Sequence, residues 1–351
     1  MLFSVIGTPS ALAHSGCSLV RMIADAAFGS HAFINAIYPE DIKKVWSNID
    51  FSVTKAVVIY SSLPSKPLAE LLLTTHAPTL IFSESFKTIA EFLNNAKNVD
   101  PLEALRKASQ AVCSIGLVSD AYVLSITSAE FSRTLQDTII DLCEFYNIED
   151  PKKVASAVIK SASADPQSTF GDFVAREQFR PVPQKEAAKT RLDDLGFSFE
   201  FLAGQYAKIG LNKPNPEMTW PTGLFLDGTR AGKKITGPID LLGPSRYLVY
   251  GPYMHLPAGD WRVIVVIEVS GNASGNRLFA DVASACVPVT GVTTSLPKTG
   301  LFEFEMQFRI DDPVHPIEVR LRILEGAIEG RLWLRQVIFH PLQNAASGQT
   351  L

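Results

Sequence analysis

The chain has 351 residues, of which 46% are hydrophobic and 19% are charged, a composition typical of a folded protein long enough for two domains with separate cores. Its formal net charge is −4 at pH 7. We therefore expect no nucleic-acid partner, because no basic field attracts a phosphate backbone. We also expect no membrane span, because no apolar run reaches about 18 residues.

The four cysteines, Cys17, Cys113, Cys143 and Cys286, are widely spaced. None forms a Cys-x-x-Cys pair, so the sequence predicts no metal site and no redox dithiol. Reduced thiols are typical of a cytoplasmic protein, which is the location we expect. The opening residues MLFSVIGTPSALA lack the basic start and the continuous apolar stretch of a signal peptide, so they are better interpreted as a buried first strand.

The first half of the chain alternates short apolar runs with helical patterns. The runs are continuous and β-rich, as in strands buried on both faces of a parallel sheet. The segments between them have apolar residues near helical spacing. This alternation predicts a three-layer α/β domain over residues 1–165. The predicted strands are 2–7, 55–62, 78–84 and 121–127, and the predicted helices are 17–28, 67–76, 86–96 and 100–116.

The pattern changes after this domain. Residues 166–195 are polar with scattered prolines, which predicts a linker. Residues 196–342 contain short alternating strands separated by turns such as PAGD and SGNASGN, which predicts an antiparallel β-sandwich of jelly-roll type. We interpret residues 343–351 as a flexible tail.

The opening stretch VIGTPSALAHSGCSLVRMI, residues 5–23, looks like a strand, a loop and a helix. Such a loop binds phosphate when backbone N–H groups and the positive end of a helix point into one concavity. The nucleotide-hydrolase signature Gly-x-x-x-x-Gly-Lys-Ser/Thr is absent from the sequence, so hydrolysis of ATP or GTP is disfavoured.

This stretch resembles the opening of the sulfotransferase family, in which Gly-Thr-Pro, a basic residue and Ser-Gly-Ser/Thr-Thr surround the sulfonate donor. A later segment, AYVLSITSAEFSRTLQDTIIDLCEFYNIED, is similar to that family's last strand, acidic turn and long helix. The resemblance covers about residues 1–160 and implies a P-loop type fold. It implies a donor site for 3′-phosphoadenosine 5′-phosphosulfate with Ser15, Gly16, Cys17 and Ser18 in the loop and helix start.

The same resemblance implies roles for residues that depart from the family pattern. His14 stands where the family has Arg or Lys, and it could act as a cation or a base. After the third strand the family often has Arg and a later Ser, whereas YSSLPSKPLAEL has no Arg but offers Ser61, Ser62 and Lys66. Lys66 could hold a phosphate as a point charge. The preferred interpretation is an ordinary surface residue for His14 and Lys66, and turn and cap residues for Ser15, Gly16 and Ser18.

In the second domain, YGPYMHLPAGDWRV and EGAIEGRLWLRQVIFHPL resemble strands of carbohydrate-binding-module-like β-sandwiches. Sugar rings stack on aromatic faces, so Tyr250, Tyr253, His255 and Trp261 are the candidate carbohydrate-binding residues; Tyr247 lies in the same cluster. The alternative is that alternate aromatic residues of these strands face the core.

Three functions remain open. The leading hypothesis is a glycan-associated protein with a degenerate, non-catalytic sulfotransferase-like domain and a carbohydrate-binding sandwich, acting in the assembly or attachment of a bacterial-type surface polysaccharide. The second is an active sulfotransferase that modifies a glycan. The third is a structural protein that binds a protein partner or forms a homo-oligomer.

Overall fold

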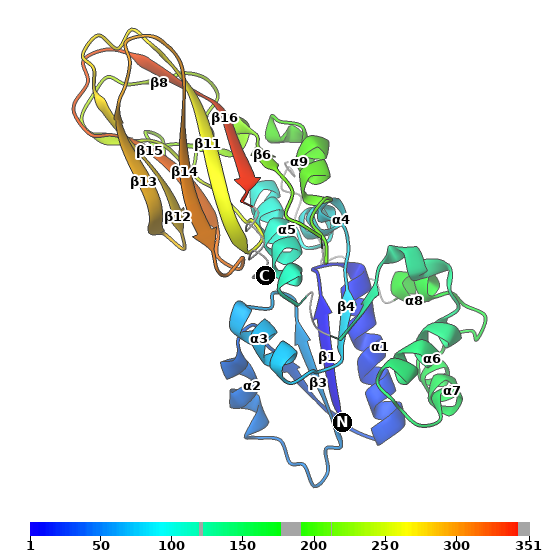
Figure 1. Ribbon diagram of the computed structural model, residues 1–351. Coiled ribbons are helices and arrows are strands. Elements are labelled where there is room, and N and C mark those ends of the chain that lie inside the picture. Colours follow the sequence, from blue (N-terminus) through cyan, green and yellow to red (C-terminus); the bar gives the residue numbers. More distant parts are fainter. Residues whose placement is uncertain (119–121, 177–190, 212, 343–351) are drawn as a thin grey trace, which may run out of the picture. The chain divides into compact units, whose positions relative to one another are not determined.

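The computed structural model describes residues 1–118, 122–176, 191–211 and 213–342. The chain divides into two compact units (Figure 1). Unit 1 comprises residues 1–99 and 114–189, and unit 2 comprises residues 100–113 and 190–351. The division after residue 189 falls inside the predicted linker, and the predicted tail lies outside the described residues.

Unit 1 is an α/β fold around one five-stranded parallel sheet of order β2-β3-β1-β4-β5. The sequence predicted this architecture and four of the strands. Its elements are β1 (Leu2–Gly7), α1 (Ala11–Phe28), β2 (His31–Asn35), α2 (Pro39–Trp46), β3 (Ala56–Ser61), α3 (Lys66–Thr74), β4 (Thr79–Phe82), α4 (Phe86–Glu91), η1 (Phe92–Ala96), η2 (Gly116–Val118), β5 (Val123–Ile126), η3 (Ser128–Ser132), α6 (Leu135–Phe145), α7 (Pro151–Ser161) and α8 (Phe170–Arg176).

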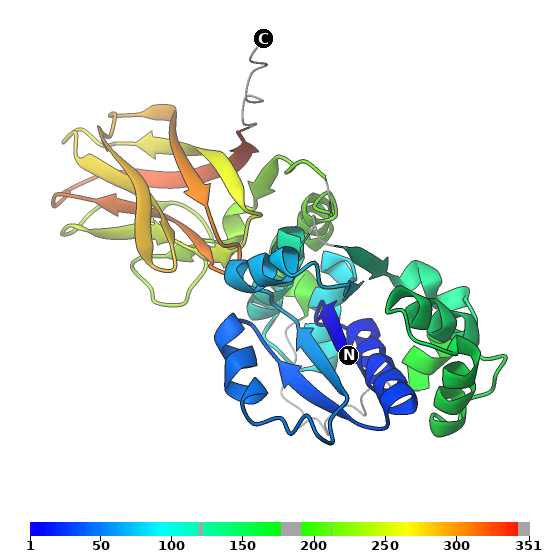
Figure 2. The same ribbon diagram turned by 60° about the horizontal axis from the view of Figure 1, so that its bottom comes forward.

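Helices cover both faces of this sheet (Figure 2). Helix α1 packs against one face, where Phe3, Leu80 and Phe82 lie in one core with residues of α6, α7 and α8. Helices α2 and α3 lie on the other face, where Val57 and Ile59 pack with Leu68. Helix α8 falls in the segment predicted as a linker, so that prediction was wrong for its residues, whose buried aromatic side chains join the unit 1 core.

Helix α1 begins six residues before the predicted start. Ser10 has an extended backbone, and its hydroxyl accepts the Ala13 N–H at 3.1 Å, which makes Ser10 the N-cap. Gly16 lies inside this helix and faces β4: a Cβ placed there would lie 2.5 Å from the ring of Phe82. Glycine therefore allows the close approach of α1 to the sheet.

Unit 2 is an antiparallel β-sandwich, as predicted. One sheet has the order β13-β12-β15-β9-β7 with β10 paired to β15, and the other has the order β14-β11-β16-β6 with β8 paired to β16. The elements are α5 (Pro101–Ile115, of which residues to Cys113 belong to unit 2), η4 (Leu192–Leu195), α9 (Phe199–Tyr206), β6 (Met218–Trp220), η5 (Thr222–Leu224), β7 (Leu226–Asp227), β8 (Ile239–Asp240), β9 (Arg246–Tyr250), β10 (Pro252–Met254), β11 (Gly259–Ser270), β12 (Arg277–Ser284), β13 (Val287–Ser295), β14 (Gly300–Ile310), β15 (Ile317–Ile323) and β16 (Arg331–Pro341).

Helix α5 was predicted as part of the first domain, and that assignment was wrong. Asp100 caps the helix, because its carboxylate accepts the N–H groups of Leu102 and Glu103. Residues of α5 then bond to the sandwich, as with the Gln110 side-chain amide, which donates to the Val314 carbonyl at 2.8 Å. None of the helices in the described part of the chain is both long enough and apolar enough for a membrane span.

We expect Gly16→Ala to destabilise the protein by roughly 1–3 kcal/mol, because the added methyl group overpacks the contact between α1 and Phe82. Denaturant unfolding of the full chain measures the change. The matched control is Gly204→Ala in helix α9, where a Cβ meets nothing within 4 Å. That variant is expected to be neutral or slightly more stable, and equal effects of the two substitutions would contradict the packing role of Gly16.

Candidate functional site

The carboxyl ends of the parallel strands carry a group of polar side chains. Thr8 follows β1, and its hydroxyl accepts the backbone N–H of Glu84, which follows β4, at 3.0 Å. The Ser128 hydroxyl, after β5, donates to the Glu84 carboxylate at 3.3 Å. Burial raises the pKa of Glu84, and hydrogen bonds from Ser128 and Ser85 oppose this only in part. The ionisable residue that is hydrogen-bonded to the loop after β1 is thus Glu84. Its carboxylate form repels a phosphate.

All four residues predicted to form the donor loop and helix start lie inside helix α1, so the placement of Ser15 and Gly16 in a loop was wrong. The cause is the cap at Ser10: the N–H of His14 donates to the Ser10 carbonyl at 3.2 Å, which begins the helical hydrogen bonding. Backbone N–H groups from this point onward are used within the helix. His14 is exposed and Ser18 half-buried, whereas the remaining three residues are buried: Ser15, Gly16 and Cys17.

The buried members of this set have the character of core residues. Burial raises the pKa of Cys17 to about 11, although Arg21 lowers it in part, so the thiol is protonated at neutral pH. The hydroxyl of Ser15 has no hydrogen-bond partner within the described part of the chain. Neither group presents a charge or a free backbone donor to a ligand.

The other predicted donor residues do lie at the sheet's carboxyl edge. Ser61 ends β3 opposite Ile6 of β1, and its buried hydroxyl has no partner among the residues described. Ser62 follows it and is half-buried, and Lys66 is the half-buried first residue of α3. The structure thus brings Ser61 and Ser62 to the edge where the loop after β1 lies. Binding by these residues remains a prediction.

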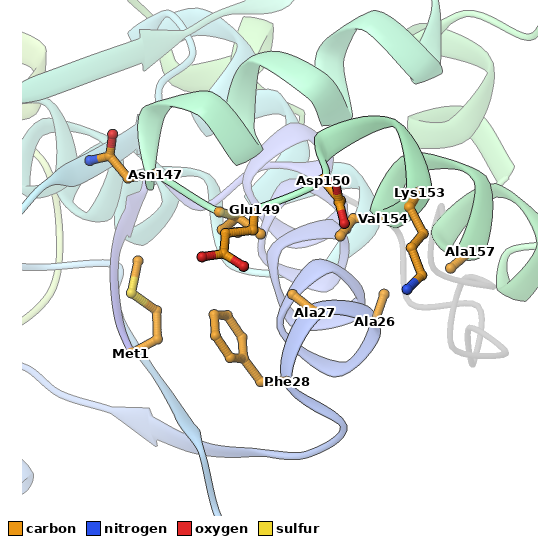
Figure 3. A pocket seen from close by; sticks show the side chains of 11 residues that line it. Met1, Ala26, Ala27, Phe28, Asn147, Glu149, Asp150, Lys153, Val154 and Ala157 are labelled. Atoms are coloured by element: carbon orange, nitrogen blue, oxygen red, sulfur yellow. The ribbon is translucent and has the colours of Figure 1, made fainter.

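A hollow of about 530 Å³ lies at the opposite edge of the sheet, beside the start of β1 (Figure 3). Its lining includes Met1, Phe28, Glu149, Asp150 and Lys153. It contains none of the predicted site residues. Within the described residues, no group of three or more His, Cys, Asp or Glu side chains is arranged to hold a metal ion.

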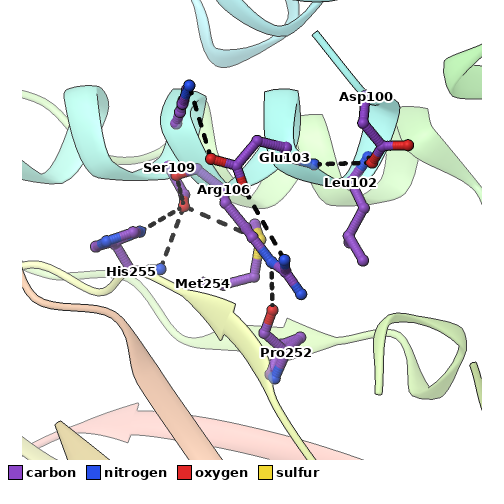
Figure 4. A network of polar contacts seen from close by, with 9 residues as sticks. Asp100, Leu102, Glu103, Arg106, Ser109, Pro252, Met254 and His255 are labelled. Atoms are coloured by element: carbon purple, nitrogen blue, oxygen red, sulfur yellow. Dashed lines mark hydrogen bonds and ion pairs between the residues drawn. The ribbon is translucent and has the colours of Figure 1, made fainter. Parts of the chain in front are cut away.

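Two of the predicted carbohydrate-binding residues are buried in unit 2. Trp261 is 0% exposed, and its indole N–H donates to the Pro257 carbonyl at 3.0 Å. His255 is covered by helix α5 (Figure 4), where its backbone N–H donates to the Ser109 hydroxyl at 3.2 Å and its Nδ1 lies 3.1 Å from the same oxygen. These two assignments were wrong, because both side chains serve packing contacts that exclude a ligand.

Tyr250 and Tyr253 are half-buried and lie beside each other, with ring centroids 6.3 Å apart. The guanidinium of Arg106, from α5, lies 4.9 Å from the Tyr253 ring centroid and donates to the Pro252 carbonyl at 2.9 Å. Burial, together with the neighbouring Glu318 carboxylate, raises the pKa of Tyr253 to about 12. The two tyrosines therefore belong to a cluster that joins α5 to the sandwich.

The outward side of the β13-β12-β15-β9-β7 sheet carries aromatic and charged side chains together. Along β15, the apolar residues at 317, 319, 321 and 323 are buried in the core, so the residues between them point outward. Strand register places partners from β12 and β9 beside them. We call this surface the β15 face and define it by Tyr247, Phe279, Asp281, Glu318, Arg320 and Arg322.

One row of the β15 face crosses three strands. Phe279 of β12 pairs with Arg322 of β15, which pairs with Tyr247 of β9. Tyr247 is 40% exposed, and its ring centroid lies 5.7 Å from the guanidinium of Arg322 and 5.8 Å from that of Arg320. The ring of Phe279 lies against Gly291, where a Cβ would be 2.9 Å from it. Glycine therefore provides the space in which this ring lies on the sheet.

A buried ion pair lies next to this row. Arg320 donates from Nε to one carboxylate oxygen of Asp281 at 3.0 Å and from Nη2 to the other. Asp281 is 1% exposed, and this pairing raises the pKa of Arg320 above its usual range. Two parallel hydrogen bonds hold the guanidinium in one plane.

The other sheet offers a comparable pair on its outward side, with a different charge balance. The guanidinium of Arg335 lies 5.6 Å from the ring centroid of Trp333. It also donates from Nε to the Glu268 carboxylate at 2.8 Å, so its charge is compensated. For Arg322, the described part of the chain places no carboxylate within ion-pair distance.

No family model matches the chain, and no curated protein matches it. Solved structures similar to part of it include the xylan-binding module CBM15, with 11% identity over 38% of this chain and 100% of the module and a TM-score of 0.28. The CBM36-1 domain of a multidomain xylanase from the hindgut metagenome of Trinervitermes trinervoides matches with 7% identity over 37% of this chain and 100% of that domain, at a TM-score of 0.26.

TmCBM61, solved in complex with beta-1,4-galactotriose, matches with 13% identity over 37% of this chain and 89% of that chain, at a TM-score of 0.23. These likenesses are too weak to assign a ligand to this chain. With no family model matched, the resemblance of unit 1 to sulfotransferases also remains a prediction.

The burial of His255 predicts that stability depends on pH. Burial lowers the pKa of His255 to about 3 from 6.5, while hydrogen bonds with the backbone of Val314 and Arg106 oppose this shift in part and the charges of His315 and Arg106 add to it. Below pH 6.5 the unfolded chain binds a proton that the folded chain does not, so the free energy of unfolding falls as the pH falls from about 6.5 to about 3. Denaturant unfolding across this range measures the slope.

His255→Gln is expected to flatten this dependence, because the titrating group is gone. His76→Gln, at an exposed histidine, controls for the loss of one histidine and keeps the wild-type slope. An unchanged slope in His255→Gln would show that other groups cause the loss of stability in acid.

Proposed function

We propose that this protein binds a glycan on the β15 face of its sandwich. The observation that carries the proposal is the exposed ring of Tyr247, which lies 5.8 Å and 5.7 Å from two guanidinium groups and in the same cross-strand row as Phe279. Sugar rings present C–H patches that pack on aromatic faces, while their hydroxyl groups need donors and acceptors nearby. The β15 face supplies both kinds of group from rigid strands.

The spacing of the two aromatic rings suits an oligosaccharide, with a different sugar unit on each ring. Tyr247 and Phe279 lie on β9 and β12, with β15 between them. Two strand intervals separate their backbones by roughly 10 Å. An oligosaccharide lying across β15 would contact both rings and pass over Arg322. The Asp281–Arg320 pair fixes the surface beneath it.

In this proposal unit 1 is a sulfotransferase-like domain without a catalytic role, and the protein acts in the assembly or attachment of surface polysaccharide. Two observations support the non-catalytic part. Residues 15–18 lie inside α1, and the group attached to the loop after β1 is Glu84, an acid. Sulfonate transfer needs positive charge where negative charge develops on the donor.

We expect Tyr247→Ala to weaken binding of polysaccharides about tenfold or more, which corresponds to about 1.4 kcal/mol or more. Affinity electrophoresis of the purified full chain against a set of neutral and acidic plant and bacterial polysaccharides measures the loss. Trp333→Ala is the matched control, since it removes an aromatic ring beside an arginine from the other sheet.

If Trp333→Ala, and not Tyr247→Ala, abolishes binding, the β15 face is the wrong surface. If the wild-type protein binds no polysaccharide and Tyr247→Ala changes its mass in light scattering, the face is a protein interface, and the structural alternative is favoured.

Calorimetric titration with 3′-phosphoadenosine 5′-phosphate is expected to give no saturable binding, because Glu84, which follows β4, is bonded to the loop after β1 and α1 uses the backbone N–H groups of residues 15–18. Saturable binding that Lys66→Ala or His14→Ala abolishes would contradict the non-catalytic role. It would favour an active sulfotransferase instead.

A further inference from the structure

The β15 face has two acids and two arginines, but Arg322 is not paired with either acid. Its two acids already have partners: Asp281 binds Arg320, and Glu318 lies against the hydroxyl of Tyr253. Glu325, at the end of the same strand, accepts the backbone N–H of Arg277 and also pairs with its guanidinium. Arg322 is exposed, and among the residues described it has an aromatic neighbour but no carboxylate. A positive charge is thus presented at the centre of the aromatic row of a chain whose net charge is −4.

We propose that Arg322 binds an anionic group of the glycan, either a carboxylate or a sulfate ester, and that the β15 face therefore selects acidic over neutral glycans. This inference rests on the proposed function. Guanidinium is charged at every physiological pH and presents a planar set of donors that matches the paired oxygens of a carboxylate or sulfate. An anion bound there completes the ion pair that the chain itself does not supply.

The position of Arg322 also favours contact with a bound glycan. The register places Arg322 directly between Phe279 and Tyr247, so a glycan that packs on both rings passes over this guanidinium. Tyr247 lies 5.7 Å from it, a contact that restrains the long side chain while leaving its donors available. Since a rigid donor loses little entropy on binding, this arrangement favours recognition of a charged substituent.

The test uses the full-length protein and pairs of polysaccharides that differ in charge: polygalacturonate with its methyl ester, glucuronoxylan with unsubstituted xylan, and dextran sulfate with dextran. We expect an acidic member to bind about tenfold or more tightly than its neutral partner, as a charge-assisted hydrogen bond implies. The first two pairs report on carboxylates and the third on sulfate esters, so the source of the anion is distinguished.

Arg322→Gln is expected to remove the preference for the acidic member and to leave weak binding of the neutral member unchanged. Tyr247→Ala weakens both. Arg335→Gln, on the other sheet and paired with Glu268, is the matched control and leaves the preference intact. Thermal unfolding of each variant verifies that the fold is kept.

The outcomes separate the two proposals. Equal binding of acidic and neutral members, or a preference that persists in Arg322→Gln, overturns the role of Arg322 while the β15 face remains a glycan site. Binding of none of the polysaccharides by the wild-type protein overturns glycan binding itself, and the role of Arg322 with it.

Discussion

The sandwich depends on the alternation of side chains along β15. This strand lies inside its sheet, between β12 and β9, so its two sides meet different surroundings. Ile317, Val319 and Leu321 enter the core, and the charged residues between them can lie only on the outward side. A shift of one residue would turn these charged residues into the core and the apolar residues of the strand outward. The register that stabilises the fold is therefore the same register that assembles the β15 face.

The Asp281–Arg320 pair adds a second constraint to that surface. Removing one partner of a buried pair leaves an uncompensated charge, at a cost of about 3–5 kcal/mol. The pair is therefore retained as a unit, and it uses the donors of Arg320 that would otherwise compete for a ligand. Arg322, two residues further along the strand, therefore carries the guanidinium group of this face that is not paired with a carboxylate among the described residues.

The sequence predicted both folds because continuous apolar runs and clean alternation are properties of local segments. It missed β2, whose residues are largely exposed or half-buried and give no strong periodic signal. The sequence also placed the start of α1 too late, because Ser10 and Ser15 are both plausible caps. In addition, the sequence does not distinguish Gly16, which allows packing on Phe82, from a glycine in a loop. Which serine caps the helix is decided by tertiary packing.

The candidate site was harder to predict for the same reason. Five aromatic or histidine side chains cluster between residues 247 and 261, and the local sequence does not show which of them α5 and the second sheet bury. The spacing of IEVRLRI did carry a usable signal, since its charged residues alternate with apolar ones and must share a face. The absence of a carboxylate near Arg322 depends on contacts between strands distant in sequence.

Helix α5 has a consequence for how the protein is made. Ser109 and His255 bond to each other but are 146 residues apart in the chain. At the usual rate of ribosomal synthesis, the helix emerges on the order of ten seconds before the strand that it covers. Throughout that interval the face of α5 that later packs on Met254 and His255 is uncovered in the nascent chain. Unit 2 can therefore complete its fold only after β16 has been made, although its first element, α5, is made more than 200 residues earlier.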